Sequence, residues 1–222
     1  MSSTTTVEWA SGRRRREARG CRLAQTSGWS YVDLVAEEQQ YTVVAVHPGF
    51  EVRRYDAHVV AEVMVEGSLE NAGNRAFRSL AGYIGGRNHT GRSVAMTAPV
   101  LQQAAAGRRM AMTSPVVQRE GDRPGSHIVG FVMPADERLE TLPEPDDVRV
   151  TLRAVPVEFA AALRYSGRWT QAGYQERAAR LQQAIADAGL RAVGQPRWAR
   201  FNPPWTPWFL RRNEVVVPVA AP

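Results

Sequence analysis

The sequence of 222 residues predicts an α+β fold, in which a duplicated β-β-α-β-β unit forms a distorted antiparallel β-barrel or sheet of about eight strands flanked by two helices. Two observations support this prediction. In each half of the chain, β-favouring segments precede one amphipathic helix. One glycine ends the last of these segments, and another ends the helix. The order of elements is then the same in both halves, which indicates a pseudo-twofold domain.

The first half begins with β-favouring segments at residues 41–46, 50–55 and 59–65, and a Pro-Gly turn joins the first two. Gly67 ends the third segment. Ser68 is expected to cap a helix of about four turns, because apolar residues follow at helical spacing as far as the Gly85-Gly86 stop.

The second half repeats this order. Strands are expected at residues 148–152 and 157–165, followed by a helix capped by Thr170 and ended by Gly189. Two further strands, 197–201 and 214–217, follow the helix. Residues 127–133 are predicted to form an extra strand between the two halves.

One six-residue phrase occurs twice, as Ala95–Val100 and Ala111–Val116. Each copy is β-favouring and carries a proline, which belongs at the end or edge of a strand. The copies are therefore predicted to be neighbouring strands with Met96 and Met112 buried in one environment. Buried methionines there could fill the core or line the pocket of a flat hydrophobic ligand.

Charge is distributed unevenly along the chain. All 28 basic residues are arginine, and residues 1–22 hold six of them against two glutamates. Residues 1–36 are therefore predicted to be a flexible, Arg-rich leader that can make a weak anionic contact, and residues 37–219 to be the domain. The nearly balanced charge of the domain does not indicate a specific nucleic-acid surface.

The chain contains no apolar run of the roughly 18 residues that a membrane span needs, and no apolar secretory signal. It has a single cysteine, which fits a reducing compartment, so a cytoplasmic protein is expected.

Sequence motifs of catalysis are missing. The four histidines fall in four different segments without metal-ligand spacing, and neither a nucleophile elbow nor a phosphate-binding glycine loop is present. Large apolar side chains are instead concentrated near the C-terminus, which favours binding over catalysis.

Five segments together resemble the SOUL/haem-binding protein family: Phe50–Tyr55, Tyr83–Asn88, Val94–Val100, Asn202–Trp205 and Arg211–Val215. The resemblance covers residues 37–219 and implies a fold similar to bacterial effector-binding domains. It further implies a soluble, non-catalytic protein that sequesters or carries haem or another porphyrin. An enzyme that degrades or uses haem, and an effector-binding module for another apolar ligand, remain as alternatives.

The resemblance also implies that the first helix and adjacent loops contact the ligand. The cofactor-binding candidates are Phe77, Leu80, Ala81 and Ile84 as apolar walls, Arg75 and Arg78 as partners of the haem propionates, and Met96. The apolar residues of this set could equally be core, and the arginines a solvated face.

Some members of the family carry a histidine, proposed as the axial ligand, where this chain has Arg54. No residue is therefore assigned as a metal ligand, and His58 is kept as a weak axial candidate beside Met96 or no protein ligand. Glu214 is expected to bind a nearby arginine and so to fix the terminal strand.

Overall fold

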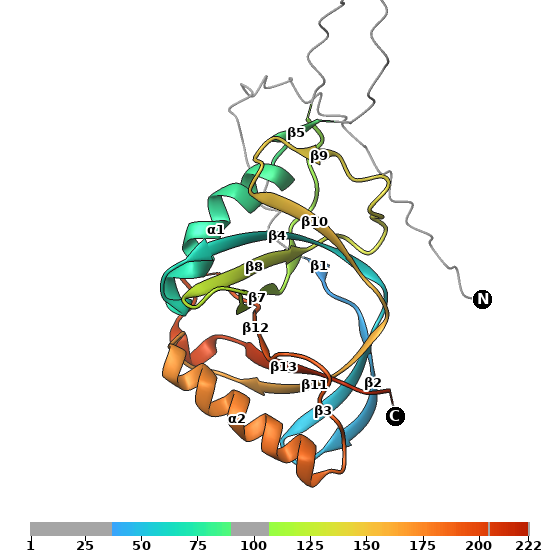
Figure 1. Ribbon diagram of the computed structural model, residues 1–222, viewed down its shortest axis with the longest axis vertical. Helices are drawn as coiled ribbons and strands as arrows, with labels where there is room; N and C mark the ends of the chain where they lie inside the picture. Colours follow the sequence, from blue (N-terminus) through green and yellow to red (C-terminus); the bar gives the residue numbers. More distant parts are fainter. Residues whose placement is uncertain (1–36, 90–106, 204, 222) are drawn as a thin grey trace, which may run out of the picture.

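The computed structural model describes residues 37–89, 107–203 and 205–221 (Figure 1). Its α-helices are α1 (Leu69–Ile84) and α2 (Gln171–Asp187). The strands are β1 (Glu37–Glu38), β2 (Tyr41–His47), β3 (Phe50–Tyr55), β4 (His58–Glu66), β5 (Asn88–His89), β6 (Thr113–Ser114), β7 (Val116–Glu120), β8 (Ser126–Val132), β9 (Glu144–Pro145), β10 (Val150–Val155), β11 (Glu158–Tyr165), β12 (Arg197–Arg200) and β13 (Asn213–Val219). No helix in the described ranges is both long enough and apolar enough to cross a membrane.

Nine strands form one antiparallel sheet in the order β10-β4-β8-β7-β12-β13-β11-β3-β2. The duplicated unit is β3-β4-α1-β7-β8 in the first half and β10-β11-α2-β12-β13 in the second. The first strand of each unit pairs with the second strand of the other, as β3 with β11 and β10 with β4. This confirms the predicted α+β class with its two helices, and the sheet stays open, with β10 and β2 at its edges.

The pairing corrects one element of the prediction. The strand predicted to lie between the halves is β8, which pairs with both β4 and β7 and completes the first unit. The additional strand is β2, at the edge beside β3. Sequence order alone could not show this, because a strand is assigned to a unit by its hydrogen-bonded neighbours.

Each helix covers the outer face of one half of the curved sheet (Figure 1). Helix α1 packs on Val59, Ala61 and Val63 of β4, whereas the alternate residues Val60 and Glu62 face the opposite, concave side. Helix α2 packs on the other half through Tyr174, Ala178, Leu181 and Ile185.

The two helices begin and end with different capping interactions. The Thr170 hydroxyl accepts a hydrogen bond from the Gly173 N–H at 3.2 Å, and Gly189 has φ +71°, so both predicted ends of α2 are confirmed. Ser68 occupies the N-cap of α1, but its side chain bonds no helix N–H. Glu70 of α1 also accepts the Gln171 N–H at 2.6 Å and thereby links the starts of the two helices.

The prediction that Met112 is buried in a strand is wrong. Met112 is exposed and precedes β6, a two-residue strand that pairs in parallel with β1. Thr113 and Ser114, which form β6, are buried, but the apolar character of the phrase did not show that Met112 lies outside the strand. The other copy of the phrase, with Met96, lies outside the described residues, as do residues 1–36.

Candidate functional site

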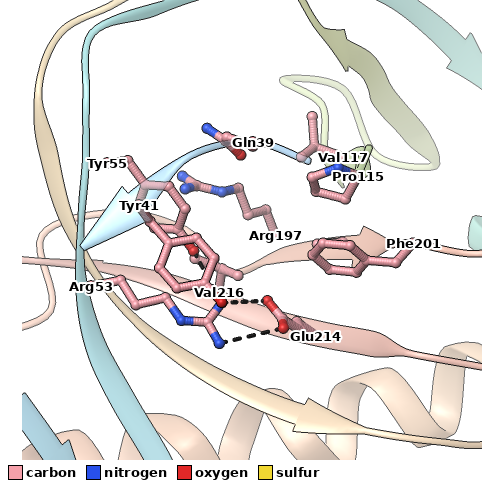
Figure 2. Close-up of a pocket in the computed structure, with 11 residues that line it drawn as sticks. Gln39, Tyr41, Arg53, Tyr55, Pro115, Val117, Arg197, Phe201, Glu214 and Val216 are labelled. Atoms are coloured by element: carbon pink, nitrogen blue, oxygen red, sulfur yellow. Dashed lines mark hydrogen bonds and ion pairs between the residues drawn. The ribbon is translucent and has the colours of Figure 1, made fainter. Parts of the chain in front are cut away.

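The concave side of the sheet holds a buried ion pair between strands from the two halves of the chain (Figure 2). Arg53 of β3 donates from Nη1 to Glu214 Oε2 of β13 at 2.6 Å. The side chains of Arg53 and Glu214 are only 4% and 1% exposed. The ring of Tyr41 covers the Arg53 guanidinium, with its centroid 4.2 Å from Cζ.

Two further charged residues complete this network. Glu51 accepts a second bond from Arg53 at 2.9 Å, and Arg212 donates from Nε to Glu214 Oε1 at 3.1 Å. Burial alone would lower the pKa of Arg53, but the hydrogen bonds and charge of Glu214 outweigh it and raise that pKa, so the guanidinium stays charged. The expected structural role of Glu214 as an arginine partner is confirmed.

Beside this network lies an open cleft, which we call the central cleft. Its cavity volume is about 270 Å³, near the lower end of the usual size range of ligand clefts, and it is open to solvent. Its apolar lining is Val60, Val117, Ile128, Val132, Val155 and Pro218, and its charged lining is Glu62, Arg119, Arg153, Glu158 and Arg197. Because these residues come from β4, β7, β8, β10, β11, β12 and β13, the cleft depends on the assembled sheet.

Ion pairs hold the arginines of the central cleft in place. Glu62 accepts from Arg153 at 2.5 and 3.0 Å and lies 3.5 Å from Arg119. Arg197 is paired with Glu158. Three arginines therefore face two glutamates, which leaves one surplus positive charge.

His58 stands in the lining of the same cleft. Its Nδ1 lies 2.8 Å from the carbonyl oxygen of Asp56, and since a carbonyl only accepts, Nδ1 carries the proton. Nε2 therefore presents a lone pair, which accepts from the Gln39 side-chain amide at 3.1 Å. Burial lowers the pKa of His58, an effect that Arg197 and Arg153 reinforce, so the neutral form predominates at neutral pH.

These residues fit a tetrapyrrole. The apolar wall suits a flat macrocycle, the surplus cation suits carboxylates, and a neutral imidazole oriented through Nδ1–H is a common iron ligand in haem proteins. Within the described residues, no group of three or more His, Cys, Asp or Glu side chains could hold a free metal ion.

The structure places the predicted α1 residues away from this cleft, on the outer face. Leu80 and Ile84 are buried in the core under α1, and Ala81 is partly buried. Phe77 is exposed, with its ring edge-on to Phe131 at 5.8 Å.

The two predicted arginines of α1 are both exposed. Arg75 donates from Nη1 to the Glu66 carbonyl at 2.6 Å. The α1 set and His58 are therefore not brought together, because His58 lies on the strand face that points away from the helix. The α1 set stays a prediction.

Sequence reasoning missed the charged residues of the central cleft. One signal was available for Glu62, a carboxylate in the middle of the apolar segment 59–65. Arg153 and Arg197 lie on strands far along the chain from Glu62 and His58, and only strand pairing brings them close.

Comparison with solved structures gives three examples of similarity. The crystal structure of the EcmrR C-terminal domain is 10% identical, with a TM-score of 0.48 over 82% of this chain and 99% of that chain. A hydrolase from Listeria innocua is 13% identical, with a TM-score of 0.47 over 85% and 96%. The structure of SAV2435 bound to tetraphenylphosphonium is 10% identical, with a TM-score of 0.44 over 78% and 94%.

No curated protein sequence matches the chain. The family described as SOUL heme-binding protein, in contrast, matches residues 36–218, which is most of the chain. This match confirms the resemblance that the five sequence segments indicated. The chain therefore belongs to the SOUL haem-binding protein family.

Proposed function

We propose that this protein binds haem or a related tetrapyrrole in the central cleft and sequesters or carries it without altering it. The observation that carries the proposal is the position of His58, a neutral imidazole whose Nε2 lone pair is held by the Gln39 amide, in a cleft with an apolar wall and a surplus arginine charge. The membership of the haem-binding family supports the class of ligand.

The hydrogen bonds of His58 explain how its ring would be oriented to bind iron. The bond from Nδ1–H to the Asp56 carbonyl at 2.8 Å fixes the tautomer and the ring orientation. Gln39 donates to Nε2 at 3.1 Å, and this amide must turn aside before iron can bind there. Gln39 precedes β2 in a short connection, so its side chain can turn without moving the sheet.

Removal of His58 tests the proposal directly. Loss of an outer-shell partner usually weakens metal binding by about 10–100-fold, and we expect His58→Ala to weaken haemin binding at least as much. The substitution should also shift the ferric Soret band to that of haemin without an imidazole ligand. The measurement is a titration with haemin followed by the Soret band. His89→Ala is the matched control, because His89 is exposed on β5 and outside the cleft lining.

The same titration separates the cleft from the surface of α1. If the double variant Arg75→Glu, Arg78→Glu loses haemin while His58→Ala binds normally, the ligand lies along α1 and the cleft proposal fails. Adding a reductant and oxygen to the loaded protein then tests for chemistry. A stable Soret band supports carriage, whereas loss of the band with release of iron would indicate haem degradation.

A second prediction concerns charge in the central cleft. Glu62 offsets Arg119 and Arg153, whose side chains are 34% and 47% exposed, so water can solvate them when the carboxylate is removed. We expect Glu62→Gln to tighten haemin binding by about fivefold, the equivalent of ~1 kcal/mol for a partly exposed ion pair.

The dimethyl ester of haemin is the control ligand, because it lacks the propionate charges and should not respond to this substitution. Equal changes for haemin and its ester would show that the Glu62 substitution acts through packing. The propionates would then have to lie elsewhere.

A further inference from the structure

The connection between β12 and β13 exposes an unusual run of apolar side chains. Trp205, Trp208, Phe209 and Leu210 are between 48% and 78% exposed, and Pro207 is exposed as well. Four consecutive apolar residues, 207–210, therefore face solvent. We call residues 205–210 the aromatic loop. Such a contiguous apolar patch on a monomer usually marks an interaction surface.

Hydrogen bonds hold this loop in one conformation. The Trp208 carbonyl accepts the Gly167 N–H at 3.1 Å, which ties the loop to the end of β11. Within the loop, the Leu210 N–H donates to the Pro207 carbonyl at 2.9 Å, and Arg211 donates from Nε to the Thr206 carbonyl at 2.8 Å. The apolar side chains are thus presented on a fixed backbone, which lowers the entropy lost on binding.

Positive charge surrounds the aromatic loop. The Arg168 guanidinium lies 5.5 Å from the Trp208 ring, and the Arg211 guanidinium lies 4.1 Å from the ring of Trp169. The aromatic loop and these two arginines line one open hollow. Glu70 is the one acidic residue of its lining. The Glu70 carboxylate already accepts the Gln171 N–H at the start of α2. The rim of the aromatic loop is therefore cationic.

We propose that the aromatic loop docks on a lipid bilayer that carries anionic headgroups. Exposed Trp, Phe and Leu side chains with arginines beside them are the composition of peripheral membrane anchors. The apolar rings enter the boundary between headgroups and acyl chains, and the exposed Arg168 contacts the phosphates. This docking surface is separate from the central cleft and does not depend on haem binding.

Charge favours a lipid surface over a second copy of the chain. In a twofold contact the same patch faces itself, so the cationic rims of the two copies would be brought together. The Glu70 carboxylate offsets one of the two arginine charges of the lining, so each copy would bring one surplus positive charge to the contact. An anionic surface complements the same rim.

The test is co-sedimentation of the full chain, without haem, with phosphatidylcholine vesicles that contain or lack phosphatidylglycerol. We expect binding to the anionic vesicles and at least a tenfold loss of binding in the double variant Trp208→Ser, Leu210→Ser, because two large apolar side chains no longer leave water. Arg168→Glu should weaken binding to the anionic vesicles and reduce its dependence on salt.

Val148→Ser and Val46→Ser are matched controls, since these valines are highly exposed but lie on other parts of the surface. They should bind vesicles as the parent does. Vesicle binding that survives the Trp208→Ser, Leu210→Ser substitutions would overturn the proposal and assign the binding to other cationic segments, such as the six arginines of residues 1–22.

Self-association is the other outcome that would overturn the proposal. Size-exclusion chromatography would then show a concentration-dependent dimer that the double variant loses, with no binding to vesicles. Because none of these measurements contains haem, failure of the docking proposal leaves the haem proposal intact, and failure of haemin binding leaves the docking proposal intact.

Discussion

Replacing Glu214 with alanine is expected to lower the free energy of unfolding by about 3–5 kcal/mol, the usual cost of removing one partner from a buried ion pair. The substitution leaves Arg53, with only 4% of its side chain exposed, without its strongest partner. It also removes the acceptor of the Arg212 bond at 3.1 Å. Urea denaturation of both proteins, followed by circular dichroism, measures the difference.

Glu51→Ala is the matched control for this prediction. Glu51 binds the same Arg53 at 2.9 Å, but its side chain is 39% exposed, so its loss should cost only about 0–1 kcal/mol. If the two alanine variants were equally stable, the ion pair of Arg53 and Glu214 would contribute no more to the free energy of unfolding than a surface ion pair does. The double variant Arg53→Met, Glu214→Leu should recover part of the stability, because Arg53 is no longer a buried charge without its partner and Arg212 keeps its bond to Glu38 at 2.9 Å.

Replacing Trp198 with alanine is expected to cost about 3–5 kcal/mol, because it removes a large side chain from the core and leaves a cavity. Trp198 of β12 is fully buried, and its ring stacks on Tyr174 of α2 at 5.6 Å. The Arg200 guanidinium lies 4.0 Å from the centroid of the same ring, and burial lowers the pKa of that arginine to about 10. Thermal unfolding of the variant should therefore begin well below that of the parent.

Trp205→Ala removes the same side chain from the exposed aromatic loop and serves as the control. Its effect on stability should stay within about 0.5 kcal/mol, as for most surface substitutions. A comparable loss in both variants would mean that the aromatic loop contributes to the core of the protein, which would also weaken the case for a docking surface.

The sequence predicted the secondary structure well where the signal is local. The burial period along α2, its Thr170 cap and its Gly189 stop all depend on residues within a few positions of each other, and each matches the structure. Met112 was misjudged because an apolar, β-favouring phrase does not show at which residue its strand begins. Only the pairing of Thr113 and Ser114 with β1 settles this, and it leaves Met112 outside the strand.

The candidate site was much less accessible to sequence reasoning. His58 was noted as a weak ligand candidate, but nothing local indicated that it lines the same cleft as Arg153 and Arg197. The direction of its side chain follows from the two-residue period of β4 and from which face α1 covers. The family resemblance implied that α1 contacts the ligand, and the structure places that helix on the outer face.

The sequence by itself determined the α+β class, the duplicated unit, the two helices and the family, because these depend on periodicity, glycine stops and motif order. Only the tertiary structure decided which strands are neighbours, and with them the ion pair of Arg53 with Glu214, 161 residues apart, and the composition of the central cleft. The physical reason is that the sheet pairs strands from opposite halves of the chain. Side chains from these strands meet on its concave face only after distant segments have found their register.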